Sequence, residues 1–394
     1  MAAALSYSVD RSPTLKRHHG SCGSNSSSNS ERNDTSLNQQ RDLPYRIGFT
    51  MTADRHVAQE PFGHGYKTKP MSRPKNWKSF SQVEYCLSQD MLGGSTFYDS
   101  TMSLDITAII RTGYDMGAQL VVVNNDLVAK IYDPLCYAGI NELDEKQDVF
   151  RSAYGDFSRE ATAYIEIQKS AAIALTPAFH GSWVVTVDTP ILQDGEIKIH
   201  RRQIPLIILE YLRGNTMMET DPYSLSLELR SAILKQAIDA ESMLWMEGIS
   251  HRDFATRNII VAGLDNSNPE DITAGVHIKI IDFNASIVRY HPKSDYHSTY
   301  ETAKSLLITN GLSKLPSPIM RYHGSMSEFV DGWVGNGRYD ADVWLWEQYH
   351  DDDRYMPVVW DPENPHIRPQ YAYVVTQPKK DSEHTRNDSG TEGN

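Results

Sequence analysis

The chain of 394 residues has little cysteine and no long apolar run. Its three cysteines, Cys22, Cys86 and Cys136, show neither pairing nor metal-ligand spacing, which is typical of a reducing compartment. No stretch approaches the ~18 consecutive apolar residues that a membrane-spanning helix requires. The opening residues MAAALSYSVDRSP contain too short an apolar segment for a signal peptide. We therefore expect an intracellular protein, cytoplasmic or nuclear, with no membrane span.

Positive charge is also in deficit. Lys and Arg number 38 against 51 Asp and Glu, so the formal net charge is −13. Nucleic-acid binders need a basic surface that displaces counterions, so we expect no nucleic-acid partner. A local positive pocket for an anionic ligand remains compatible with this composition. Hydrophobic residues at 40% and charged residues at 23% are ordinary for a folded chain of one large or two smaller domains.

Large apolar residues are nearly missing from both ends. Residues 1–45 include HHGSCGSNSSSNSERNDTSLNQQ, and residues 376–394 are similarly polar. Such segments cannot bury enough surface to offset their ordering entropy. Both are therefore predicted to be disordered tails, and residues 46–103 to be a partly ordered N-terminal extension.

From residue 104 onward the hydrophobic pattern predicts regular structure. DITAIIRTG and AQLVVVNNDLVAKIYD indicate three strands, with a tight turn at Asn124 to Asp126. DFSREATAYIEIQKSA has helical spacing, and QIPLIILEYL is a dense strand run. A long amphipathic helix in LELRSAILKQAIDAESMLWMEG should stop at Gly248. Two further strands, NIIVAG and VHIKIIDF, follow. Strands first and helices later predict an α+β chain in two lobes.

The polar residues in this framework suit one kind of chemistry. Phosphoryl transfer from a nucleotide needs a lysine for the phosphates, carboxylates for a divalent metal and a carboxylate that orients the attacking hydroxyl. Lys130 lies in LVAKI, and Glu160 follows on the next helix, where it can hold Lys130 by ion pairing. Glu166 competes for that role. Asp253 and Asn258 share the loop HRDFATRN, and Asp282 ends the strand IKIID.

These segments resemble the protein-kinase superfamily. LVAKI resembles its V-A-I-K strand, HRDFATRN matches H-R-D-L-x-x-x-N with Phe254 for Leu, and DFN resembles D-F-G. LIILEYLRG is similar to the inter-lobe hinge, with Leu209 at the gatekeeper position. The similarity covers about residues 104 to 290. Within the superfamily, the sequence resembles a set of fungal kinase-like proteins. It implies a bilobal fold with an antiparallel-sheet N-lobe (residues 104–212) and a reduced, mainly helical C-lobe (residues 213–375).

The resemblance also implies roles for single residues. Asp253 would accept or orient the proton of the acceptor hydroxyl, and Asn258 and Asp282 would ligate magnesium. Arg257 matches the tyrosine-kinase loop H-R-D-L-A-A-R-N, in which arginine can steer an anionic or aromatic acceptor.

Other residues would bind ATP. Lys130 would contact its α- and β-phosphates, with Glu160 as support. The backbones of Glu210 and Leu212 would hydrogen-bond the adenine edge. Gly113 and Gly117, in RTGYDMGAQLV, would lie over the phosphates.

Several family features are missing. A full G-x-G-x-x-G is absent, and Asn284 replaces the glycine of D-F-G. No A-P-E follows; SPI at 317–319 is the nearest candidate, and Asp331 in DGWVGNG only faintly matches a further kinase motif. Because 112 residues follow Asp282 in this sequence (394 − 282), we expect a reduced C-lobe.

Three functions fit these observations. The first is an ATP- and Mg²⁺-dependent phosphotransferase to a hydroxyl acceptor, on a protein rather than on a metabolite. The second is a small-molecule kinase like the aminoglycoside or choline phosphotransferases, which the missing A-P-E favours and the HRD sequence disfavours. The third is a nucleotide-binding pseudokinase scaffold, which the irregular glycine loop and Asn284 permit.

Overall fold

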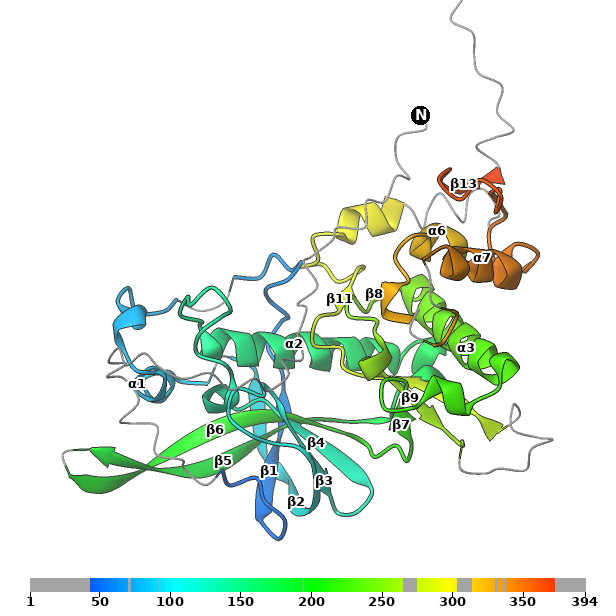
Figure 1. Cartoon of the computed structure of the whole chain (residues 1–394). Coiled ribbons are helices and arrows are strands. Elements are labelled where there is room, and N and C mark those ends of the chain that lie inside the picture. The colour runs from blue at the N-terminus through cyan, green and yellow to red at the C-terminus, as the bar shows by residue number, and fades with distance from the viewer. Residues whose placement is uncertain are drawn as a thin grey trace, which may run out of the picture. The chain divides into compact units, whose positions relative to one another are not determined.

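The computed structural model describes residues 43–69, 72–91, 93–193, 195–264, 275–302, 314–329, 332–335 and 338–372, all within the unit Leu43–Asn394. The chain is an α+β protein with a large antiparallel sheet (Figure 1). Residues 1–42, Asp331 and the tail predicted for 376–394 lie outside the described residues. None of the helices in the described ranges has the length and apolarity needed to cross a bilayer.

Six strands form a closed antiparallel barrel in the order β1-β2-β3-β4-β6-β5. They are β1 (Thr50–Val57), β2 (Ser95–Arg111), β3 (Gln119–Val123), β4 (Leu127–Ile131), β5 (Phe179–Gln193) and β6 (Glu196–Glu210). Strand β1 pairs with both β2 and β5, which closes the sheet and removes its edges. The barrel thus includes residues of the extension predicted for 46–103.

Alternation along the strands creates two buried faces. Ile204, Leu206 and Ile208 of β6 face the barrel interior, whereas Ile207 and Leu209 pack on the outer side against helix α2 (Val149–Ile167). A strand buried on both faces reads as a continuous apolar run, as predicted for this segment.

The same alternation places Lys130. Its neighbours Ala129 and Ile131 belong to the barrel core, so Lys130 points to the outer face, where α2 lies. The hairpin before it turns at Asn124 and Asn125, whose φ angles of 54° and 69° are those of a left-handed two-residue turn. The predicted turn is confirmed.

Helix α2 is longer at its start than the predicted segment 156–171. It begins at Val149 after Asp148, whose side chain accepts a hydrogen bond from the Arg151 amide, and it ends at Ile167. Such an N-cap satisfies one of the free amides of the first turn. The short helix α1 (Gln82–Leu87) begins at a capping box formed by Ser81 and Glu84.

The rest of the described chain combines helices with short strands of two to four residues. Helix α3 (Leu227–Met246) is capped by Ser226, and the chain leaves it at Gly248, whose φ is +84°. Around it lie β7 (Asn215–Thr216), β8 (Ile249–Ser250), β9 (Ile259–Ala262), β10 (His277–Ile280), β11 (Ile287–Val288), α6 (Pro318–Tyr322), α7 (Arg338–Tyr349), β12 (Val358–Val359) and β13 (Gln370–Tyr371). Strand β9 pairs with β10 and β7.

A buried ion pair fixes the barrel. The Asp133 carboxylate accepts two hydrogen bonds from the Arg202 guanidinium, at 2.6 and 2.9 Å. It also accepts the Tyr45 hydroxyl at 2.8 Å and the Leu135 amide at 3.0 Å. Tyr45 falls inside the tail predicted for residues 1–45, yet it is buried in the barrel core. Burial acts to raise the pKa of Asp133, but Arg202 more than offsets this and the pKa is lowered.

We expect Asp133→Asn to lower the free energy of unfolding by about 3–5 kcal/mol, because the Arg202 guanidinium would be left buried without its counter-charge. The matched control is Asp188→Asn, which removes one side of the exposed Asp188–Arg201 pair and should change that free energy by less than about 1 kcal/mol. Urea unfolding followed by tryptophan fluorescence measures both. Equal effects of the two substitutions would contradict a stabilising role for the buried pair.

Candidate active site

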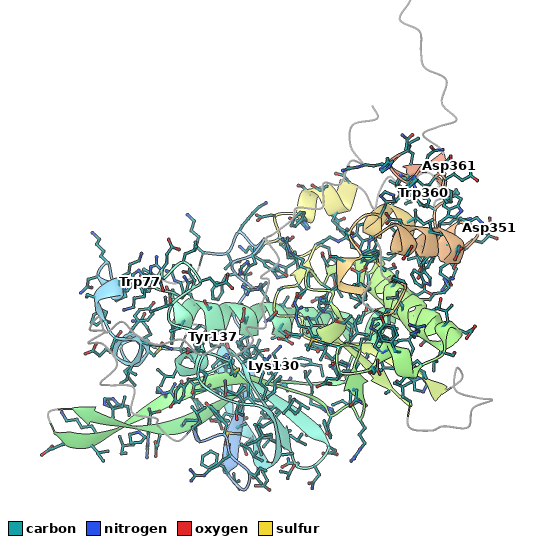
Figure 2. The ribbon with its side chains drawn as sticks, viewed as in Figure 1. Trp77, Lys130, Tyr137, Asp351, Trp360 and Asp361 are labelled. Carbon is teal, nitrogen blue, oxygen red and sulfur yellow. The ribbon has the colours of Figure 1, made fainter. Side chains whose placement is uncertain are left out.

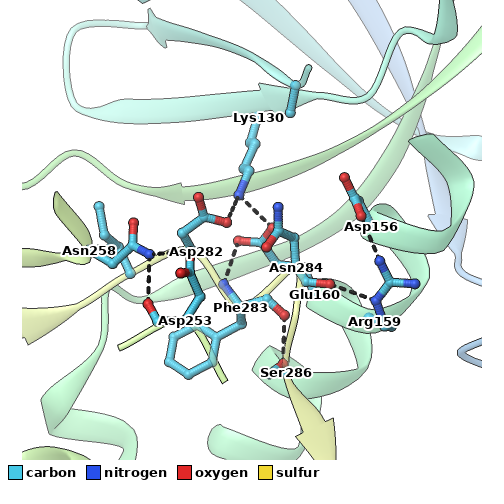
Figure 3. A network of polar contacts seen from close by, with 12 residues as sticks. Lys130, Asp156, Arg159, Glu160, Asp253, Asn258, Asp282, Phe283, Asn284 and Ser286 are labelled. Carbon is cyan, nitrogen blue, oxygen red and sulfur yellow. Dashed lines mark hydrogen bonds and ion pairs between the residues drawn. The ribbon is translucent and has the colours of Figure 1, made fainter. Parts of the chain in front are cut away.

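Lys130 lies where strand β4 faces helix α2 (Figure 2). Its Nζ atom is 2.6 Å from Glu160 Oε2 and 2.7 Å from Asp282 Oδ1 (Figure 3). Lys130 is 3% exposed and Glu160 is 0% exposed. Three charged groups from three distant parts of the chain therefore meet, with Lys130 and Glu160 buried and the Asp282 side chain 25% exposed.

The structure distinguishes between the two candidate glutamates. Glu160 contacts Lys130, and it also accepts the Tyr132 hydroxyl at 2.8 Å and the Phe283 amide at 3.2 Å. Glu166 instead pairs with Lys169 and accepts the Tyr290 hydroxyl. Glu160 is thus the partner of Lys130.

Mutual attraction favours the charged forms of Lys130 and Asp282. Burial acts to lower the pKa of Lys130, but Asp282 and Glu160 outweigh it and raise the pKa to about 12. Burial acts to raise the pKa of Asp282, but Lys130 outweighs it and lowers the pKa. The pKa of Glu160 is raised by burial, which Lys130 only partly opposes. Removing the ammonium would therefore expose both carboxylates to the full desolvation penalty.

Asp253 and Asn258 form a second group beside the first. Asn258 Nδ2 donates to the backbone oxygen and to Oδ2 of Asp253, both at 2.9 Å, and Arg257 Nη2 donates to Asp253 Oδ1. Arg257 is also 44% exposed and Asp253 34%. The amide nitrogen of Asn258 is fully used, which leaves its Oδ1 as an acceptor.

His251 joins the two groups, a role that we did not assign from the sequence. Its Nδ1 accepts the Asp253 amide at 3.2 Å, and its Nε2 lies 2.9 Å from the Ile281 carbonyl oxygen. Because Nδ1 must accept, Nε2 carries the proton and donates it. Burial lowers the pKa of His251, which keeps the ring neutral. Its ring packs edge-on against Phe283 at 4.8 Å.

Backbone strain occurs at two positions of the site. Arg252 has a φ of +64° and Asp282 of +66°, in the left-handed region that costs a residue other than glycine about 1–3 kcal/mol. Such conformations persist where surrounding contacts impose them, and they cluster at functional sites.

Two oxygen atoms remain open. Asp282 Oδ2 and Asn258 Oδ1 have no hydrogen-bond partner among the described residues. Carboxylate and amide oxygens are the ligands that Mg²⁺ prefers. Within the described parts, no group of three or more His, Cys, Asp or Glu side chains is placed to hold a metal. A metal held here would take its other ligands from a bound phosphate and water.

The turn between β2 and β3 carries the two predicted glycines. Gly113 and Gly117 have φ angles of +149° and +71°. The buried side chain of Gln119 closes the turn: its Oε1 accepts the Gly113 amide at 2.6 Å, and its Nε2 donates to the carbonyls of Gly113 and Gly117 at 3.0 and 2.8 Å. Gln119 was not among the predicted site residues; its only signal in the sequence is a polar residue at the start of an apolar strand.

The segment expected to bind adenine follows strand β6. The Glu210 amide donates to the Ala178 carbonyl at 2.9 Å, and Glu210 Oε2 accepts the Ala178 amide at 3.0 Å. Within the described ranges, the backbone of Leu212 has no hydrogen-bond partner. Glu210 and Leu212 both line a cavity of about 650 Å³, and Glu210 also borders one of about 130 Å³.

No family model and no curated protein matches the chain. Among solved structures it is similar to two crystal structures of WbdD, one of them with a kinase inhibitor. Each is 12% identical with a TM-score of 0.32, and the matches cover 64% and 66% of this chain. They cover 47% and 49% of the WbdD chains, so this chain spans about half of their length. Likeness at this level carries no information about activity.

We expect Lys130→Met to reduce the free energy of unfolding by about 3–5 kcal/mol near neutral pH, because Glu160 and Asp282 lose their shared counter-charge. The pKa of Glu160, already raised, should rise further. A carboxyl with a raised pKa in the folded state contributes stability that is lost as pH rises through that pKa, so the deficit should grow as pH rises through the pKa of Glu160. Urea unfolding at a series of pH values measures it.

Lys169→Met is the control for this variant. Lys169 pairs with Glu166 on the same helix, but its side chain is mostly exposed. Its loss should change the free energy of unfolding by less than about 1 kcal/mol at every pH. A pH-independent deficit for Lys130→Met would contradict the proposed electrostatics.

Proposed function

We propose that the chain is an ATP- and Mg²⁺-dependent phosphotransferase of bilobal protein-kinase-like fold, which transfers the γ-phosphate to a hydroxyl on a protein. One observation carries the proposal. Lys130 contacts both Glu160 and Asp282, and His251 links this cluster to Asp253. In this proposal the N-lobe is residues 104–212 together with the barrel strand β1 and the start of β2, which lie before residue 104. Residues 213–375 form the reduced C-lobe, and the protein is intracellular.

The nucleotide would lie between Lys130 and the segment after β6. The Lys130 ammonium, held by Glu160, would contact the α- and β-phosphates. The open backbone of Leu212, with the Glu210 carbonyl, would hydrogen-bond the adenine edge. Gly113 and Gly117 would let the turn approach the phosphates closely, because they carry no side chain.

Asp282 Oδ2 and Asn258 Oδ1 would hold the magnesium ion, since both oxygens are open and both suit a hard cation. When bound, such an ion neutralises negative charge that develops on the phosphate oxygens. Asp282 has a left-handed backbone, and its Oδ1 contacts Lys130 at 2.7 Å.

Asp253 would take the proton of the acceptor hydroxyl. Its carboxylate is fixed by Asn258 and Arg257, so little reorientation is needed when an acceptor arrives. Arg257 is exposed and would be the first cation to meet an anionic or aromatic acceptor.

One observation favours a second candidate, the nucleotide-binding scaffold. Both carboxylate oxygens of Asp253 already accept hydrogen bonds, from Arg257 and from Asn258. A chain that keeps these contacts when nucleotide is bound would hold ATP without turnover.

Nucleotide binding is the first test. At about 100 times its dissociation constant, Mg·ATP should stabilise the protein by about 2.7 kcal/mol, seen as a rise in melting temperature. ATP with EDTA should raise it less, because Asp282 and Asn258 would then hold no metal. Asp282→Ala should remove the magnesium-dependent part, whereas the fully exposed Asp353→Ala should not. Equal shifts with and without Mg²⁺ in the wild type would contradict the proposal.

Turnover is the second test. Labelled ATP is supplied with a protein extract and, separately, with a metabolite pool, and phosphate transfer is followed. We expect label on protein, and a loss of about 100-fold or more in Asp253→Ala with nucleotide binding retained. Label only on metabolites would indicate a small-molecule kinase. Binding without any transfer would indicate the scaffold.

A further inference from the structure

A short segment between the barrel strands β1 and β2 lies along the chain that follows Asp282. We call residues 62–67 the strap. The Tyr66 hydroxyl accepts the Val288 amide at 2.8 Å, the Lys67 amide donates to the Lys293 carbonyl at 2.7 Å, and the Asp295 amide donates to the Gly65 carbonyl at 2.9 Å. Tyr66 is buried. The strap therefore binds the backbone of residues 288–295 at three points.

One side chain ties the strap to helix α2 and to the residues beside Asp282. Arg159 Nε donates to the Asn284 carbonyl at 2.6 Å, and Nη1 donates to the Phe62 carbonyl at 2.8 Å. Its Nη2 donates to Asp156 Oδ1 at 2.6 Å (Figure 3). The guanidinium is almost fully buried. A fork of planar donors satisfied by three segments has little freedom to move.

Two glycines permit this arrangement. Gly155, one turn before Arg159 in α2, has no side chain; a Cβ there would be 2.8 Å from Arg159 Nη1 and 3.4 Å from Phe62 Cε2. At Gly65, whose φ is +94°, a Cβ would be 2.4 Å from Ile287 Cδ1. Glycine is unfavourable in a helix interior, so close packing explains Gly155 better than helix formation does.

These contacts converge on Asp282. Glu160 binds the Phe283 amide and Arg159 binds the Asn284 carbonyl, so adjacent residues of α2 grip adjacent residues of the chain after Asp282. Phe62 anchors the other end, in a cluster with Trp77, Tyr85, Phe150 and Tyr154. The left-handed conformation of Asp282 needs such enforcement, because an isolated residue would relax out of it.

We propose that the strap and Arg159 form a brace that positions Asp282 for metal-bound nucleotide, so that part of the connection between β1 and β2 sets the affinity of the site. Arg159 is a positioning residue that acts through the backbone of Asn284. The inference rests on the proposed function. It assigns to the strap a regulatory role, since anything that lifts residues 62–67 would release Asp282.

Gly155→Ala separates the brace from an effect on helix stability alone, because the two predict opposite changes in the local stability of residues 283–295. Helix propensity alone makes alanine stabilising at this position. The brace predicts that the new methyl group displaces the Arg159 guanidinium. Amide hydrogen exchange of residues 283–295 should then become at least about tenfold faster, while strand β6 stays protected. The dissociation constant for Mg·ATP should rise at least about tenfold, and that for ATP in EDTA by less than about threefold.

Gly65→Ala tests the strap itself, and Gly48→Ala is its matched control. Both glycines have positive φ, at +94° and +83°, but no atom lies within 4 Å of a Cβ built at Gly48. Backbone strain is therefore common to both, and only Gly65→Ala pushes the strap away from Ile287. It should reproduce the effects of Gly155→Ala, and Gly48→Ala should not.

The exchange and binding measurements separate the possible failures. Unchanged exchange of residues 283–295 in both test variants would overturn the brace, whatever the nucleotide does. Faster exchange with unchanged Mg·ATP affinity would also overturn it, although the proposed function would stand. If the wild type binds no Mg·ATP, the proposed function and the control of affinity both fail, and exchange still reports whether the strap holds the segment.

Discussion

The buried Lys130 ammonium between Glu160 and Asp282 is the interaction on which the described structure depends. A charge removed from water is tolerated only beside opposite charge and with its hydrogen bonds made. That requirement draws together strand β4, helix α2 and the end of the β9–β10 hairpin, which are far apart in the sequence. The surrounding apolar cluster, which includes Tyr164 and Phe283, lowers the local dielectric and so strengthens both the attraction and the penalty for losing it.

Helix α2 contacts the barrel, the strap and the segment that follows Asp282. One side packs on the outer face of the barrel through residues such as Phe157 and Ala161. Glu160 joins the buried charges, and Arg159 joins the strap and the backbone beyond Asp282. Because all these contacts come from one helix, a small shift of α2 would change the Lys130 contact and the position of Asp282 together. Gly155 makes the helix less stable than alanine would, but it leaves room for the Arg159 guanidinium.

The segment that follows the site is anchored to helix α3. SPI at 317–319, the nearest match to A-P-E, is a helix start: Ser317 caps α6 and Pro318 takes the first helical position. Helix α6 is held to α3 by the buried Glu241–Arg321 pair, 2.5 Å apart, and a tryptophan-rich cluster with Trp333, Trp344 and Trp360 covers α3. Glu241 of α3 thus anchors this segment, which lacks the glutamate of A-P-E.

Local structure could be predicted from the residues alone: the alternation that turns Lys130 away from the barrel core, the Asn124–Asn125 turn and helix α3. These follow from periods of 2.0 and 3.6 residues and from the conformational preferences of single residues. The choice between Glu160 and Glu166, the closure of the barrel by β1 and the place of the strap depend on contacts between distant segments, and only the fold reveals them. Arg159 binds the carbonyls of Phe62 and Asn284, and every residue carries a carbonyl, so such contacts leave no mark in the sequence.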